Sequence, residues 1–287
     1  MKLSTTVNEL ADSMGAEQAM IKLSEIGFDA VDLMFRDQRH DRIREDYMEY
    51  AQKLHKVTKQ YPITVGQTHA PFPSYIDGDP EETEFMFEQI VKAIQATACV
   101  GAEYIVIHPP IMKERRYEEK KKENKAISMD FYHRLRPYAE RYGVKIAVEN
   151  MWNFDSMRKR ICPCTCSTAE EMVDYIDTLG NDLFVACLDA GHALLTYDSP
   201  ARMAKVLGSR LKVLHVHDVD GIDDLHTVPY LGNNDWPEFC QALKEIGYKG
   251  TFNFETNNYI SRFPSELAVP ACEFLYKIGR PLCSLYK

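Results

Sequence analysis

The sequence predicts an α/β protein, a single (β/α)8 TIM barrel over residues 1–287, on three observations. The chain has 287 residues, and α/β barrels of this length fold as one domain. Apolar stretches with a helical period alternate with short β-branched runs along the chain, which indicates βα units and a parallel sheet. Most of the predicted strands end on an acid or a histidine, and barrel enzymes carry their chemistry at the carboxyl ends of the strands.

Eight short apolar runs are predicted to be the strands of the barrel. We expect them at residues 2–6, 28–34, 62–68, 103–108, 144–149, 183–189, 211–217 and 250–255. Five times a helical pattern ends at a glycine, which favours the left-handed conformation that closes a helix. These glycines are Gly27, Gly101, Gly143, Gly180 and Gly247. A doubly wound sheet is the alternative, but residues 5–9 lack the glycine-rich phosphate turn that such a sheet uses after its first strand.

Composition and charge narrow the class of protein. Hydrophobic residues make up 45% of the chain and charged residues 27%, which is typical of a globular protein with a proper core. The formal net charge of −9 disfavours nucleic acid as a partner. The N-terminal residues show no long apolar segment, so we expect no secretory signal, no membrane contact and a cytoplasmic location. The eight cysteines are expected to stay reduced there.

Two strand-to-helix connections carry features of their own, the second of which holds both Trp152 and a cysteine cluster. The charged segment 111–128 is expected to be a solvated helix or loop, with a lid over an anionic substrate group as the alternative. Trp152 follows a strand closely enough to form a wall of a small-molecule pocket, although core packing would explain it equally well. The cluster of Cys162, Cys164 and Cys166 is predicted to be a plain loop, and a thiolate metal clip is the alternative.

Acids and histidines gather at the predicted carboxyl ends of the strands. They are Asp32, His69, His108, Glu149, Asp189, His217 and Glu255, with His192, Asp224 and His226 in the following loops. Several carboxylates in a partly buried mouth repel one another unless a cation offsets them. Carboxylates and imidazoles without thiolates suit Mn²⁺, Co²⁺, Mg²⁺ or Zn²⁺. Of His215 and His217 we expect only one to bind metal, and a lone histidine such as His69 also fits an ordinary hydrogen-bonding role.

Four short runs resemble the xylose-isomerase-like barrel superfamily, which contains sugar isomerases and epimerases. The runs are Ala147-Val148-Glu149-Asn150, Cys187-Leu188-Asp189-Ala190-Gly191-His192, Val213-Leu214-His215-Val216-His217-Asp218 and Phe252-Asn253-Phe254-Glu255-Thr256. The resemblance spans essentially the whole chain. The segment from His226 to Trp236 also resembles the family's loop ahead of the seventh helix, with Asn233 where a glutamate or glycine is usual.

The resemblance implies a metal-dependent isomerase or epimerase acting on a small polyhydroxy ketone. It assigns one divalent ion, Mn²⁺ as the first expectation, to Glu149, Asp189, His217 and Glu255. Such an ion acidifies the C–H bond beside a ketone and stabilises the enediolate that forms. Glu149 and Glu255 then serve as the acid/base pair. The resemblance further implies substrate contacts from His192, with His108, His226 and Trp152 as further candidates, and we expect a homodimer.

The sequence leaves the precise reaction open and also allows a second class of enzyme. The ketose 3-epimerases of the family carry an arginine where this chain has Asp223, so isomerase and keto-sugar dehydratase activities are alternatives. Metal-dependent apurinic endonucleases share the barrel and hold three zinc ions. Their nine ligands could be His69, His108, Glu149, Asp189, His192, His217, Asp224, His226 and Glu255. The net charge of −9 favours the sugar enzyme, because a DNA enzyme must contact several phosphates.

Overall fold

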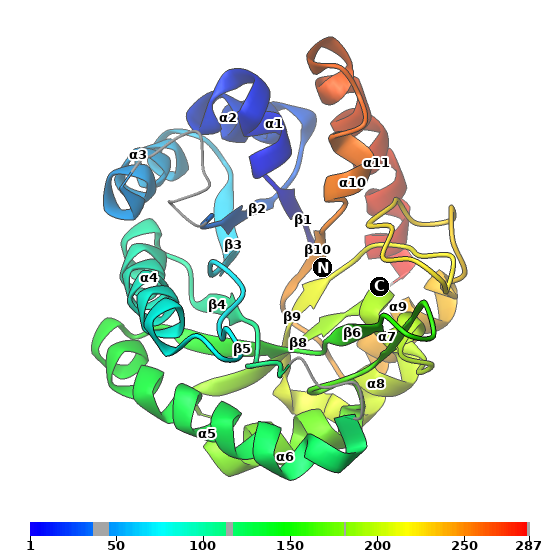
Figure 1. The fold of residues 1–287 in the computed structure, drawn as a ribbon. Helices are drawn as coiled ribbons and strands as arrows, with labels where there is room; N and C mark the ends of the chain where they lie inside the picture. The colour runs from blue at the N-terminus through cyan, green and yellow to red at the C-terminus, as the bar shows by residue number, and fades with distance from the viewer. Residues whose placement is uncertain (37–45, 113–116, 181, 286–287) are drawn as a thin grey trace.

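The chain forms a nearly closed barrel of eight parallel strands surrounded by helices (Figure 1). The structure is a computed structural model and describes residues 1–36, 46–112, 117–180 and 182–285. The barrel strands are β1 (Lys2–Thr6), β2 (Ala30–Met34), β3 (Thr64–His69), β4 (Tyr104–Ile107), β5 (Lys145–Glu149), β8 (Phe184–Asp189), β9 (Leu211–His215) and β10 (Thr251–Phe254). All eight predicted strands are confirmed.

The strands pair in the order β10-β1-β2-β3-β4-β5-β8-β9. Every neighbouring pair in this order is parallel, and a bridge between Val216 and Phe254 links the two ends of the sheet. Because all strands run in one direction around the barrel, their carboxyl ends meet at a single mouth. The fold therefore brings the strand-end acids and histidines together.

Helices form the outer layer. They are α1 (Asn8–Met14), α2 (Ala16–Ile26), α3 (Tyr47–Gln60), α4 (Pro80–Val100), α5 (Tyr117–Tyr142), α6 (Ala169–Leu179), α7 (Ala190–Leu195), α8 (Pro200–Leu207), η1 (Gly208–Arg210), α9 (Trp236–Glu245), α10 (Asn257–Ile260) and α11 (Ser265–Leu285). Side-chain caps begin several of them, such as Asp79 before α4 and Thr168 before α6. Gly27, with a φ of 112°, ends α2 in the left-handed conformation.

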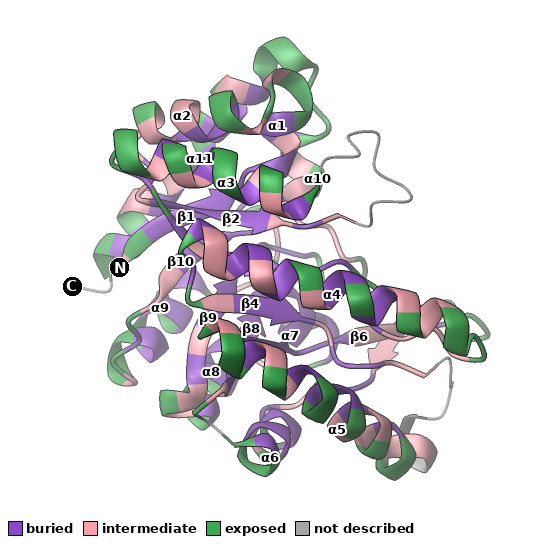
Figure 2. Cartoon of the chain, turned by 90° about the vertical axis from the view of Figure 1, so that its left-hand side faces the viewer, coloured by how far each residue is buried: buried purple, intermediate pink, exposed green. Residues whose placement is uncertain are grey.

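The core lies between the strands and the inner faces of the helices (Figure 2). Helix α4 buries Met86, Ile90, Ala93 and Thr97 at helical spacing, so one stripe faces the sheet. Close packing is visible at Gly279 of α11, where an added Cβ would lie 2.6 Å from the side chain of Leu3. Within the described part of the chain, no helix combines the length and apolar character needed to cross a membrane.

An antiparallel hairpin that the sequence did not predict follows β5. Its strands are β6 (Trp152–Asp155) and β7 (Arg160–Pro163). The cysteine cluster begins in β7, and burial raises the thiol pKa values of Cys164 and Cys166 well above the ordinary value. Cys162 thus lies in a strand and not in the predicted loop, whereas Cys164 and Cys166 follow the strand, and none of the candidate ligand groups among the described residues contains a cysteine.

The predicted connection 111–128 is partly helical. Its C-terminal part lies in α5, which begins at Tyr117. Residues 113–116 of that connection lie outside the described residues.

Candidate metal centre at the barrel mouth

Four side chains from four strands converge at the mouth and form what we term the strand-end group. They are Glu149 at the end of β5, Asp189 at the end of β8, His215 at the end of β9 and Glu255 just after β10. Each residue offers one ligand atom, and these four atoms all lie within 4.8 Å of one another. All four residues are at most 5% exposed. Three carboxylates and one imidazole at this spacing are a donor set that suits a divalent cation.

The contacts within the strand-end group leave carboxylate charge unbalanced. His215 Nδ1 lies 3.1 Å from Glu149 Oε1 and 3.2 Å from Glu255 Oε2. Burial alone would raise the pKa of Glu149, but its interactions with the imidazoles of His215 and His108 outweigh burial and hold the pKa well below the ordinary value. Glu149 Oε2 is buried and accepts no hydrogen bond, although His108 Nε2 lies 3.1 Å from it. An ionised, under-coordinated carboxylate of this kind fits a bound cation.

The structure places His215, rather than the expected His217, in the strand-end group. Residues two apart in a strand share a face, so both histidines reach the mouth. His215 pairs in register with Asp189 and therefore lies level with the other ligands. His217 lies beyond the end of β9, with its Nε2 3.0 Å from Asp189 Oδ2.

A second cluster, the loop-end group, lies beside the first. It consists of His192, His217, Asp224 and His226, whose ligand atoms also lie within 4.8 Å of one another. Asp224 Oδ2 is 3.1 Å from His226 Nε2 and 3.5 Å from His192 Nε2. The rings of His217 and His226 stack with centroids 3.9 Å apart. Burial lowers the pKa of His226, but Asp224 and Glu255 reverse this effect and raise it to about 9.

Backbone carbonyls orient the two outer histidines of the loop-end group. His192 Nδ1 donates to the carbonyl of Asn150 at 2.8 Å, and His226 Nδ1 donates to the carbonyl of Glu255 at 2.8 Å. In the neutral rings, Nε2 is then the nitrogen with a free electron pair, and both Nε2 atoms face Asp224. The indole nitrogen of Trp152 donates to the same carboxylate at 3.1 Å. The loop-end group can therefore bind either a cation or the hydroxyls of a substrate.

His69 and His108 meet at Glu149 on the opposite side of the strand-end group. Their Nε2 atoms are 3.0 Å apart, and His108 Nε2 lies 3.1 Å from Glu149 Oε2. His69 Nδ1 donates to the carbonyl of Ala70 at 2.7 Å, so its Nε2 carries a free electron pair when the ring is neutral. His69, Glu149 and His215 form a third group of candidate ligands. Glu149 thus belongs to two groups at once.

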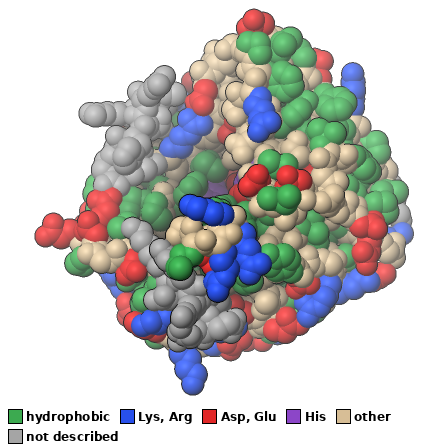
Figure 3. Space-filling view, turned by 45° about the vertical axis from the view of Figure 1, so that its right-hand side comes forward, with side chains coloured by type: hydrophobic (Ala, Val, Ile, Leu, Met, Phe, Trp, Pro, Cys, Tyr) green, Lys and Arg blue, Asp and Glu red, His purple; other side chains and the backbone are tan. Residues whose placement is uncertain are grey.

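The mouth is hollowed into a cavity of about 300 Å³. It is lined by Met34, His69, Phe72, His108, Glu149, Met151, Trp152, His192, Asp224, His226, Glu255 and Asn257. Figure 3 looks toward this side, where a histidine is visible inside a hollow with Lys and Arg side chains at its rim. Phe72, which no sequence pattern indicated, is 47% exposed and packs its ring against His69 and His108.

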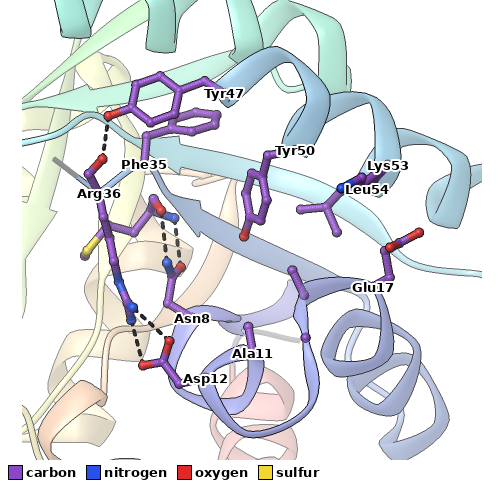
Figure 4. Close-up of a pocket in the computed structure, with 13 residues that line it drawn as sticks. Asn8, Ala11, Asp12, Glu17, Phe35, Arg36, Tyr47, Tyr50, Lys53 and Leu54 are labelled. Carbon is purple, nitrogen blue, oxygen red and sulfur yellow. Dashed lines mark hydrogen bonds and ion pairs between the residues drawn. The ribbon is translucent and has the colours of Figure 1, made fainter. Parts of the chain in front are cut away.

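A separate cavity of about 220 Å³ lies between α1, the end of β2 and α3 (Figure 4). Several polar side chains of its wall already make hydrogen bonds to one another or to the backbone. Arg36 donates to both carboxylate oxygens of Asp12, at 2.8 and 3.1 Å, and Asn8 exchanges two hydrogen bonds with the backbone of Met34. None of the three candidate ligand groups found among the described residues borders this cavity. The candidate ligands among the described residues therefore lie at the barrel mouth and not at this cavity.

Fold and site together define a (β/α)8 barrel with a candidate metal centre at its mouth. The chain belongs to the xylose isomerase-like TIM barrel family, whose model matches residues 21–278. The predicted resemblance is thus confirmed. Among curated relatives, the uncharacterized protein MJ1311 of Methanocaldococcus jannaschii is 27% identical over 247 residues, which cover 84% of this chain and 78% of the relative. An inosose isomerase of Bacillus subtilis is 25% identical over 168 residues, or 56% of each chain.

Solved structures resemble the fold over nearly its full length. A D-tagatose 3-epimerase-like protein superimposes with a TM-score of 0.76 at 24% identity, covering 99% of both chains. The IOLI protein with a bound zinc atom gives a TM-score of 0.75 at 20% identity, covering 100% of this chain and 99% of the other. At these identities the likeness establishes the barrel fold.

Proposed function

We propose that this protein is a divalent-metal-dependent isomerase or epimerase of a small polyhydroxy ketone. The observation that carries the proposal is the strand-end group, in which three buried carboxylates and His215 converge within 4.8 Å. Relatives and structural neighbours that include an inosose isomerase and a D-tagatose 3-epimerase-like protein support the substrate class. The cavity of about 300 Å³ lies at the small end of ligand pockets, which suits a single sugar-sized molecule.

The strand-end group would hold the ion. Glu149, Asp189, His215 and Glu255 fit a divalent cation because their donor atoms converge and one buried oxygen of Glu149 has no hydrogen-bond partner. Mn²⁺ is the first expectation, and the zinc atom of the IOLI neighbour supports a divalent ion in this family. When bound, such an ion polarises a carbonyl oxygen and acidifies the neighbouring C–H bond.

Glu149 and Glu255 would move the proton. Both are buried, and both lie close to His215 Nδ1, so a substrate carbon above this nitrogen is within reach of either carboxylate. One carboxylate removes the proton from the carbon beside the carbonyl, and the other returns a proton to the opposite face or to the neighbouring carbon. The first outcome inverts a centre, and the second exchanges the positions of ketone and alcohol.

The remaining side chains would bind and orient the substrate. His192 and His226 line the cavity with their Nε2 atoms near Asp224, and His108 lies beside Glu149. Trp152 offers an apolar face beside these polar groups, which suits the C–H face of a sugar. Burial of the substrate between them would exclude water from the reacting carbon.

A multi-ion phosphodiesterase of the apurinic-endonuclease type is the second candidate. It is favoured by the loop-end group and by the third group of His69, Glu149 and His215, which could hold two further ions. Together the three groups contain nine different residues, with both His215 and His217 among them, which would be enough for three ions. The net charge of −9 opposes it, because duplex binding depends on neutralising several phosphates.

Metal content and proton exchange test the proposal. Elemental analysis of protein loaded with Mn²⁺ should give one ion per chain. Incubation in heavy water with free ketoses, keto-inositols and sugar phosphates should place deuterium beside a carbonyl, as seen by NMR. Three ions per chain together with nicking of an abasic DNA duplex would instead establish the second candidate. We also propose a homodimer, which light scattering would refute by finding only a 33.0 kDa species.

A further inference from the structure

Beneath the strand-end group lies a buried carboxylate that the proposed chemistry does not use. Asp32, in the middle of β2, is 1% exposed and lies inside the barrel. Its Oδ2 is 3.6 Å from Nε2 of His215. β2 and β9 are separated in the sheet by β1 and β10, so this approach crosses the interior of the barrel. The carboxylate therefore faces the side of the imidazole ring that points away from the other ligands.

Two amide side chains hold Asp32 in place. Gln67 of β3 and Asn253 of β10 each donate a hydrogen bond to Oδ2 at 2.9 Å. Both amides are buried, with 1% and 0% exposure. Asp32 and Gln67 are also direct partners in the strand register. Although two neutral donors fix the carboxylate, its other oxygen, Oδ1, is buried without a partner. A buried carboxylate left in this state has capacity for a further N–H donor.

The two ring nitrogens of His215 have different surroundings. Nδ1 faces the carboxylates of Glu149 and Glu255 at 3.1 and 3.2 Å. Nε2 is buried and has no hydrogen-bond partner, and Asp32 faces it. A shift of about 0.5 Å would bring this nitrogen and the carboxylate within normal hydrogen-bond distance. One ring nitrogen, Nδ1, therefore lies on the side of the candidate metal ligands, and the other, Nε2, lies on the side of Asp32.

We propose that Asp32 is the positioning residue of His215. When an ion occupies the strand-end group, Asp32 accepts a hydrogen bond from Nε2–H, which leaves Nδ1 as the deprotonated nitrogen on the side of the other ligands. This inference rests on the proposed metal site. A neutral imidazole carries one N–H, and a carboxylate on that N–H fixes the ring orientation and makes the other nitrogen a better metal ligand. In the opposite tautomer, Nδ1 would donate to Glu149 or Glu255 and could not bind an ion.

Zinc affinity of the Asp32→Asn variant tests the assignment without any turnover. The variant keeps the side-chain shape but weakens the acceptor opposite Nε2. We expect competition with a chromophoric chelator to show Zn²⁺ binding about 10- to 100-fold weaker than in the wild type. An affinity within twofold of the wild type, with only a lower melting temperature, would reduce Asp32 to a structural role and overturn the proposal.

Asp29→Asn is the matched control. Asp29 precedes the same strand at the opposite end of the barrel, where it accepts from the backbone N–H of Leu3 at 2.8 Å and pairs with Arg280. This variant also exchanges a carboxylate for an amide and should lower the melting temperature. Its Zn²⁺ affinity should equal that of the wild type. An equal loss of affinity in both variants would mean that general destabilisation explains the effect, and the proposal would fail.

The tautomer can be read directly in the wild type, should Asp32→Asn not fold. Long-range ¹H–¹⁵N correlation on Zn²⁺-loaded protein with labelled histidine should show the His215 proton on Nε2, assigned by its absence in His215→Gln. A proton on Nδ1, or a wild type that binds no Zn²⁺, overturns the inference. Weaker Zn²⁺ binding in Asp32→Asn, together with no deuterium exchange in any polyhydroxy ketone, would support the positioning role of Asp32. It would reject only the proposed isomerase or epimerase activity.

Discussion

The two ligand groups at the mouth differ in what holds them. The strand-end group stands on barrel strands, is at most 5% exposed and contains three carboxylates with one histidine. The loop-end group contains three histidines and one carboxylate, and the side chains of its Asp224 and His226 are 16% and 15% exposed. Strands joined to two neighbours fix side chains rigidly, whereas His217, Asp224 and His226 lie beyond the strands and rely on local hydrogen bonds, and His192 lies in α7. We therefore assign proton transfer to the first group and substrate binding to the second.

The sharpest test of this division is removal of a strand-end carboxylate. Glu149→Gln and Glu255→Gln should each lower turnover by about 100- to 10,000-fold, since a positioned acid or base contributes that much to a rate. Steady-state kinetics on the substrate found by deuterium exchange measures this. Glu171→Gln, at a buried glutamate in α6, is the control and should keep the wild-type rate. Full activity in a Glu149/Glu255 double variant would contradict the assignment of proton transfer to the strand-end group.

A methyl group at Gly191 should disturb the loop-end group selectively. An added Cβ would lie 2.0 Å from Cε1 of His217, so the ring must move. We expect Gly191→Ala to destabilise the protein by about 1–3 kcal/mol, as overpacking does, measured by urea unfolding. Combining it with His217→Ala removes the clash and should restore much of the loss. A double variant less stable than Gly191→Ala would contradict this reason.

Loss of a loop-end imidazole should weaken substrate binding more than chemistry. His226→Asn should raise KM by about tenfold, the equivalent of one hydrogen bond of ~1.4 kcal/mol, with kcat nearly unchanged. Metal analysis of the same variant distinguishes the two candidate functions. One ion per chain in both proteins supports substrate binding by His226, and an ion lost from a multi-ion wild type would favour the phosphodiesterase.

The smallest expected effect is a pH dependence of the metal-free protein. Asp224 and Glu255 outweigh the effect of burial and raise the pKa of His226 from 6.5 to about 9. Its contribution to stability is thus complete below pH 6.5 and is lost as the pH rises through about 9. Urea unfolding between pH 6 and about 9.5 should show falling stability. The decline should be shallower in His226→Asn, and parallel curves would contradict the assignment.

Local sequence determines the strands and most of the strand-end ligands. Each strand is a short apolar run, and the acid or histidine that ends it enters the mouth once the strands are parallel. Glu149, Asp189 and Glu255 could therefore be predicted together without coordinates. The hairpin after β5 could not, because the pairing of Trp152 with Pro163 depends on how the chain crosses the mouth.

Tertiary structure alone decides which histidine joins the acids and what lies behind it. His215 and His217 share a strand face, so periodicity cannot separate them. The register of Asp189 with His215 separates them, and it is a contact between strands. Asp32 is 183 residues from His215 in sequence and approaches its ring only because the barrel closes. Sequence patterns show which residues are close along the chain, whereas closure of the barrel brings together residues that are far apart in sequence.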